Sequence, residues 1–193
     1  MAKTFRTLYG SGLSGRTNFT DAVVEGECVN DYRALMNDFA RETMRIGAAW
    51  PLVGVRGLKD REIHAIEEAL RLRLPAAYRA FLQTMGRSAG ALFGDVTMTF
   101  DGPGPLLALQ HDARDYAAGL GSPPRLKPEA FVFSDYGGSQ FSFFLCDRRE
   151  ADPEIFDYEA GNIDPPQPAG RFTDTIRYHL KEYPHRRKPF LWW

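Results

Sequence analysis

The chain has 193 residues and a mass of 21.8 kDa, with 24 basic and 25 acidic residues and a net charge of −1. Its content of 44% hydrophobic and 25% charged residues is that of an ordinary globular protein and excludes a collagen-like or disordered chain. A near-neutral chain has no overall field that attracts a phosphate backbone or an anionic membrane, so we expect neither nucleic acid nor a membrane as a direct partner.

The N-terminus and the cysteines indicate the compartment. The first residues carry Lys3, Arg6 and Arg16 but no continuous apolar run, which is unlike a secretory signal. No stretch approaches the ~20 apolar residues that cross a bilayer, so we expect a cytoplasmic protein. Cys28 and Cys146 match no zinc spacing and are expected to be reduced thiols, with no metal and no cofactor.

The first half of the chain shows helical periodicity. After a loosely held arm over residues 1–20, the pattern predicts a helix over residues 30–46 with its first residue as the N-cap. Two short helices then meet at a Leu-Pro corner. Asp60 is the predicted cap of the first, and Pro75 suits the start of the second because its fixed φ is already helical.

Strand patterns dominate the middle of the chain. Alternating and β-rich runs, turn signals and a final apolar stripe predict a strand, a helix, a hairpin, a further strand and a closing helix at residues 96–100, 106–116, 131–134 with 140–146, 154–158 and 173–183. Helices and strands are segregated along the chain, which favours a single α+β domain over alternating βαβ units.

The Leu-Pro corner resembles the opening motif of the SUKH superfamily. The motif is a helix with a glutamate, here Glu67, followed by Leu-Pro, two residues, Tyr, two residues and Phe-Leu, here Leu74 to Leu82. Further along, the superfamily's central hairpin is similar to the segments Phe131-Val132-Phe133, Asp135, Gly137-Gly138, Phe141 and Phe143. The turn after the second helix differs from the Asn-Gly-Gly type common in the family.

The resemblance implies a curved, mainly antiparallel sheet packed against helices over residues 55–184. Residues 1–54 would then form an added N-terminal arm and helix, and residues 185–193 a C-terminal tail. Many bacterial members are immunity proteins that bind a toxin made beside them, whereas other members are regulatory scaffolds. No catalytic residues belong to the fold, so the resemblance implies a cognate toxin as the partner and no enzyme activity.

The charge pattern suggests where such a partner would bind. Residues 147–164 hold seven acidic residues against two arginines, with tyrosines close by. Carboxylates and aromatic anchors together suit a basic cleft, so the predicted partner-binding residues are Asp135, Tyr136, Glu154, Asp157, Tyr158 and Glu159. The alternative is that these charges are the solvated sides of a strand and two loops.

Other interpretations stay open at this point. The basic tail ends in Phe190-Leu191-Trp192-Trp193, which either packs back on the body or supports a homodimer. The chain could also be a regulatory scaffold without a toxin. A small-molecule hydrolase or transferase would require a deep pocket that joins His111 or Cys146 to a second titratable group.

Overall fold

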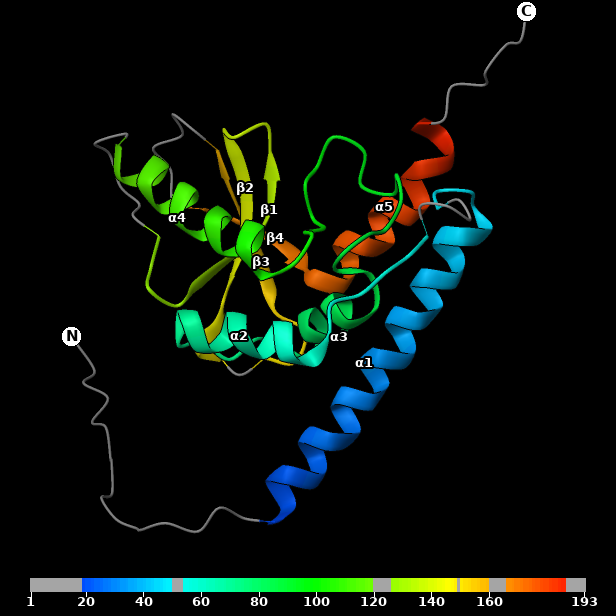
Figure 1. Ribbon diagram of the computed structural model, residues 1–193, viewed down its shortest axis with the longest axis horizontal. Helices are drawn as coiled ribbons and strands as arrows, with labels where there is room; N and C mark the ends of the chain where they lie inside the picture. The colour runs from blue at the N-terminus through cyan, green and yellow to red at the C-terminus, as the bar shows by residue number, and fades with distance from the viewer. Residues whose placement is uncertain (1–18, 50–53, 120–125, 149, 160–165, 187–193) are drawn as a thin grey trace, which may run out of the picture.

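The structure is a computed structural model that describes residues 19–49, 54–119, 126–148, 150–159 and 166–186, with side chains described from residue 31 onward. In chain order, its elements are α1 (Phe19–Arg45), α2 (Asp60–Leu70), α3 (Ala76–Met85), α4 (Pro103–Gly119), β1 (Ala130–Tyr136), β2 (Gln140–Leu145), the short 3-10 helix η1 (Cys146–Arg148), β3 (Glu154–Glu159), β4 (Pro168–Arg171) and α5 (Phe172–Arg186). The predicted α+β class and single domain are confirmed (Figure 1).

The four strands form one antiparallel sheet in the order β1-β2-β3-β4. The predicted hairpin is β1 and β2, and its turn contains Gly137 and Gly138 with φ of 63° and 75°. Glycine is favoured there because side-chain-bearing residues rarely adopt positive φ at two successive positions. Strand β3 is also at its expected place, whereas β4 was not predicted.

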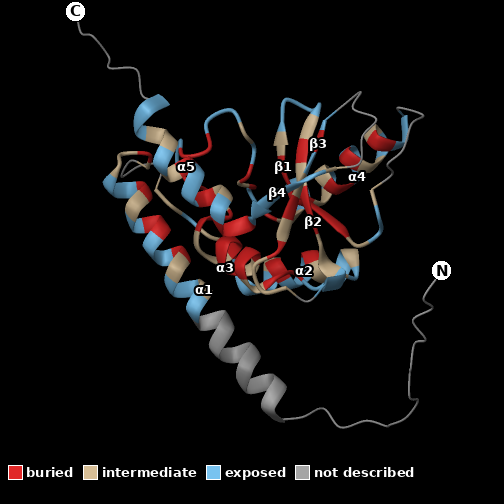
Figure 2. Cartoon of the chain, turned by 180° about the vertical axis from the view of Figure 1, so that it is seen from behind, coloured by how far each residue is buried: buried red, intermediate tan, exposed pale blue. Residues whose placement is uncertain are grey.

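Helices cover both faces of the sheet. On one face, α4 packs its small residues Ala113 and Ala117 against β-strand side chains that include Phe141 and Tyr158. On the other face, rings from α3, α5 and the strands form the main core: Tyr78, Phe81, Phe131, Phe133, Phe144 and Phe172. The second half of α1 completes this core through Met36 and Phe39. Seen from behind, the buried residues concentrate where the sheet meets α3 and the start of α5 (Figure 2).

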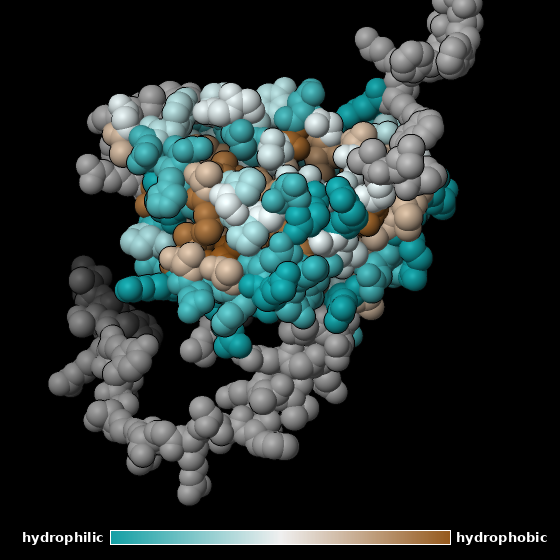
Figure 3. Space-filling model, in the orientation of Figure 1, coloured by the Kyte–Doolittle hydropathy of each residue, from teal (hydrophilic) through white to brown (hydrophobic). Residues whose placement is uncertain are grey.

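The surface around α4 has an apolar region. Figure 3 shows hydrophobic residues in the region of α4 and α2, surrounded by hydrophilic ones. Leu107 and Leu109 of α4 are half-buried and pack against the main core.

The Leu-Pro corner is held by a single glutamate. Helix α2 ends at Leu70, its C-cap Arg71 has a left-handed φ of 54°, and the chain then turns into α3. The Glu67 carboxylate accepts a hydrogen bond from the Leu74 N–H at 3.1 Å and one from Arg79 Nη1 at 2.5 Å. It thus ties the end of α2 to the connection and to the next helix, which gives a physical reason for a glutamate at this position of the motif.

Three local expectations were wrong. Helix α1 begins at Phe19 rather than at residue 30, although it ends where expected, before Gly47 with φ of 73°. Lys59, and not Asp60, is the N-cap of α2, with the Glu62 carboxylate accepting the Lys59 N–H at 2.8 Å. Residues 96–100 form no strand. Only Thr97 makes a β-bridge, with Asp135, and the alternation arises because this irregular segment buries every second side chain.

Side chains close the outer edge of β1. Gln110 of α4 is 1% exposed; its Nε2 donates to the Val132 carbonyl at 2.6 Å, and its Oε1 accepts the Val132 N–H at 2.9 Å. Arg114 Nη2 donates to the Ala130 carbonyl at 2.8 Å, and Thr97 pairs with Asp135. These contacts occupy the backbone groups that an edge strand otherwise offers to another chain.

Substituting Gln110 by leucine is expected to lower the free energy of unfolding by about 2 kcal/mol, because it leaves the buried N–H and C=O of Val132 without partners. Urea unfolding followed by circular dichroism measures the loss. The control is His111→Leu at the next, exposed position of α4, which should stay within about 0.5 kcal/mol of the parent. Equal losses for the two variants would contradict the edge-closing role of Gln110.

Candidate functional site

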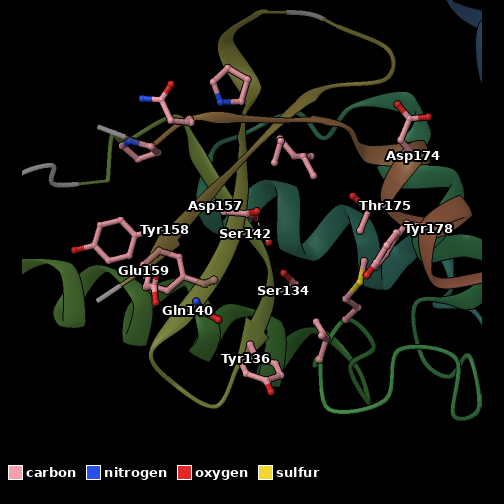
Figure 4. Close-up of a pocket in the computed structure, with 18 of the residues that line it drawn as sticks. Ser134, Tyr136, Gln140, Ser142, Asp157, Tyr158, Glu159, Asp174, Thr175 and Tyr178 are labelled. Atoms are coloured by element: carbon pink, nitrogen blue, oxygen red, sulfur yellow. Dashed lines mark hydrogen bonds between the residues drawn. The ribbon is translucent and has the colours of Figure 1, made fainter. Parts of the chain in front are cut away.

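A groove of about 1140 Å³ lies on the part of the sheet that α3 does not reach. It is on the same face as the main core, but towards the hairpin end of the strands. Its other walls are α5, the segment around Met98, and residues 166–169 at the start of β4 (Figure 4). In this region small and polar side chains replace the phenylalanines of the core, so the face is left open.

Strand register arranges the floor of the groove in two rows. The inner row is Ser134, Ser142 and Asp157, which are direct partners across β1, β2 and β3. The outer row is Tyr136, Gln140 and Glu159, each two residues from the inner row on its own strand, in the direction of the hairpin turn. Neighbouring strands are about 4.8 Å apart, so each row spans about 10 Å and ends in a carboxylate on β3.

A bulge in β1 determines which side chains face the groove. The register shifts between Val132 and Ser134, where two residues of β1 oppose one of β2. As a result Phe133 lies in the main core and Ser134, its direct neighbour, also faces that side of the sheet. The same shift places Tyr136 in the outer row and turns Asp135 to the α4 side of the ladder.

Helix α5 supplies the opposite wall with Asp174, Thr175, Tyr178 and His179. Tyr178 is 59% exposed, and Figure 4 shows it and Thr175 facing the sheet across the groove. His179 is buried, with its ring edge-on to Phe93 at 5.1 Å. Burial and the nearby Arg186 guanidinium lower the pKa of His179 to about 4, so this wall carries no positive histidine at neutral pH.

The groove is acidic. Asp157, Glu159 and Asp174 line it, and no lysine or arginine is among its described lining residues. Ser142 Oγ donates to Asp157 Oδ1 at 2.7 Å, which orients that carboxylate. Asp174 accepts from Arg177 Nη1 at 2.8 Å, so its charge is partly offset, and the two β3 carboxylates dominate the floor.

The predicted site residues are only partly brought together. Tyr136, Asp157 and Glu159 lie in the two floor rows. Tyr158 borders the groove, but its ring is stacked on Phe141 at 4.6 Å on the α4 face. The two remaining residues are engaged elsewhere: the Asp135 carboxylate accepts the Gly138 N–H at 3.0 Å in the hairpin turn, and Glu154 pairs with Arg148 at 3.1 Å.

Much of the acidic stretch is used inside the fold. Arg171 pairs with Glu150, and Asp152 accepts the Thr173 hydroxyl at 2.7 Å, which fastens the start of α5 to the chain before β3. The groove instead draws on residues with no acidic or aromatic signal, above all Ser134, Ser142 and Thr175. No sequence pattern marks these residues, because their proximity depends on strand register and on the position of α5.

The residues considered for catalysis lie apart from the groove. His111 is exposed on α4, and neither it nor Cys146 lines the groove. Burial, with a smaller contribution from the neighbouring Asp147, raises the pKa of the Cys146 thiol to about 12, so it is protonated at neutral pH.

Within the described ranges, no cluster of three or more His, Cys, Asp or Glu side chains could hold a metal ion. No helix in those ranges has the length and apolar character needed to span a membrane. The Cys28 side chain and the aromatic tail lie outside the described side chains.

The fold and its groove define an α+β protein with a recessed acidic surface beside an antiparallel hairpin. Residues 57–177 match the SMI1 / KNR4 family (SUKH-1), and the chain therefore belongs to this family. The match runs from just before α2 into α5, within the span expected from the motif, and confirms the resemblance. A search of curated proteins finds no match to the chain.

Proposed function

We propose that this protein is a non-catalytic immunity protein that binds a cognate bacterial toxin in the cytoplasm and occludes its active site. The observation that carries the proposal is the acidic groove, whose described lining has three carboxylates and no lysine or arginine. Such a surface attracts a basic partner and disfavours an acidic one, so it supplies both a faster encounter and specificity.

The exposed aromatic residues support the same surface. Tyr136 at the hairpin end is 50% exposed and Tyr178 on α5 is 59% exposed, and both line the groove. Together with Met44 of α1, they are the large exposed hydrophobic residues of the described chain. Tyrosine is enriched at the centres of interfaces because its rigid ring buries a large area at a small entropic cost.

The test is co-expression with the toxin encoded beside this gene. The parent protein should restore growth and form a complex with the toxin. The Asp157→Arg variant should bind at least ~10-fold more weakly and lose protection, because it places a positive charge where a basic partner would sit. Isothermal titration measures the affinity, and circular dichroism verifies the fold.

The matched control is Asp112→Arg, the same change at an exposed position of α4, on the opposite side of the sheet. It should protect as well as the parent protein does. Full protection by Asp157→Arg would refute the groove as the binding surface. A complex without protection would refute the toxin-neutralising role and favour the regulatory scaffold.

A further inference from the structure

We propose that the groove recognises an arginine side chain on an extended, basic segment of the partner, with the guanidinium seated at Ser134 and Asp157. The inference rests on the proposed function and specifies the chemistry of the partner at the same site. Four features of the groove support it: a hydroxyl that opens into the groove, an oriented carboxylate, an aromatic wall and the spacing of two acidic residues.

The first feature is Ser134, which is 4% exposed and lines the groove. The described part of the chain shows no hydrogen bond from its hydroxyl, and the fully buried polar atoms without a partner lie elsewhere, on Tyr78 and Gln83, so the hydroxyl opens into the groove. Figure 4 shows the Ser134 hydroxyl on the floor of the groove, between the sheet and α5. A ligand that enters the groove can therefore form a hydrogen bond with it.

The second feature is the carboxylate at the other end of the same row. The hydrogen bond from Ser142 at 2.7 Å uses one acceptor site of Asp157 and fixes its orientation. An ionised carboxylate has about four acceptor sites, so most of its capacity is left for a ligand. The row thus offers acceptors at both ends and no fixed positive charge, which calls for a ligand with several donors.

Arginine fits this arrangement better than lysine. Its guanidinium has five donors in a rigid plane, which can serve a carboxylate and a hydroxyl at the same time, whereas an ammonium is a compact point charge. The apolar stem would lie along Met98 and Ile155, which also line the groove. The exposed ring of Tyr178 on the opposite wall is available to stack on the guanidinium plane.

The spacing of the two β3 carboxylates indicates an extended segment. Asp157 and Glu159 are two residues apart on one strand and face the same way, so they are separated by about 6.8 Å. Alternate side chains of an extended peptide are separated by the same distance. A segment that runs parallel or antiparallel to β3 can therefore place an arginine at Asp157 and a second basic residue at Glu159. Such a segment has the pattern Arg-x-Arg.

The experiment uses the full chain and a fluorescein-labelled five-residue peptide, Gly-Arg-Thr-Arg-Gly, titrated by fluorescence anisotropy at low ionic strength. Its citrulline analogue has the same shape without the charges. The arginine peptide should bind at least ~10-fold more tightly than the citrulline peptide, and the lysine analogue should lie between them. The preference should shrink as salt is added, because exposed charges are screened.

Variants locate the binding. Asp157→Asn should reduce the affinity for the arginine peptide several-fold, towards that of the citrulline peptide, with the contact at Glu159 left in place, and Ser134→Ala should reduce it a few-fold. Asp112→Asn on α4 should leave it unchanged. Equal binding of the arginine and citrulline peptides, or equal effects of Asp157→Asn and Asp112→Asn, would overturn the inference.

The outcome separates this inference from the proposed function, since the peptide assay contains no toxin. Arginine-selective binding in the groove without protection against any adjacent toxin would refute the immunity role and leave the arginine site standing. A protective toxin complex, together with equal binding of the arginine and citrulline peptides, would refute the arginine site and leave the immunity role standing.

Discussion

Replacing Phe172 by alanine is expected to lower the free energy of unfolding by about 4 kcal/mol, at the upper end of what one core residue contributes. Phe172 is the first residue of α5 and is completely buried. Its ring lies 5.2 Å from that of Tyr78, 5.5 Å from that of Phe81 and 5.4 Å from that of Phe133. Its removal would leave a cavity between helix α3, helix α5 and the sheet.

The control is Phe156→Ala on β3. Phe156 is half-buried on the α4 face, where it stacks on Phe143 at 5.5 Å and the Arg148 guanidinium lies over its ring. Because less area is removed from water there, the expected loss is about 1–2 kcal/mol. Urea unfolding measures both variants. Losses of the same size would show that the aromatic cluster is not the main source of stability.

Acidification is expected to destabilise the protein through His179. This residue is 6% exposed, and its Nδ1 lies 3.1 Å from Arg186 Nη2, which can only donate. Its pKa is lowered to about 4 by burial and by Arg186. Between the ordinary histidine pKa of about 6.5 and this value, the unfolded chain binds a proton that the folded chain does not. The contribution of His179 to stability is therefore complete above about pH 6.5 and is lost as the pH falls to about 4, a loss of about 3 kcal/mol.

The matching variant is His179→Gln, which is uncharged at every pH and keeps an acceptor for Arg186. Thermal or urea unfolding between pH 7 and pH 4 compares the two proteins. The parent should lose about 3 kcal/mol more than the variant across this window, because carboxylates titrate alike in both. Parallel stability curves would show that His179 is not a source of the acid sensitivity.

Local patterns were sufficient for the elements whose residues interact with near neighbours in the chain. The Leu-Pro corner depends on Glu67 and on the fixed φ of proline, and the hairpin depends on two glycines with positive φ. Both were predicted at their observed positions. The expected strand at residues 96–100 failed because the same alternation of burial arises in an irregular segment that lies beside β1.

The site was predicted less completely, and Asp135 shows why. A regular β1 that placed Phe131 and Phe133 in the core would also aim Asp135 at that face and turn Tyr136 away from it. The bulge between Val132 and Ser134 reverses this assignment, so Tyr136 enters the groove and Asp135 caps the turn. A single extra residue in one strand is invisible in the sequence of that strand, because it exists only relative to the pairing strand.

The sequence by itself determined the class of fold, the family motif and the presence of an acidic, tyrosine-containing region after the hairpin. Those features follow from residue type and spacing, which are local properties of the chain. Only the tertiary structure decided which carboxylates are available: Glu150, Asp152 and Glu154 are engaged within the fold, whereas Asp157 and Glu159 face the groove. That selection depends on strand register and on contacts with Arg171, Thr173 and helix α5, which are distant in the sequence. The residues on either side of a carboxylate do not encode such long-range contacts.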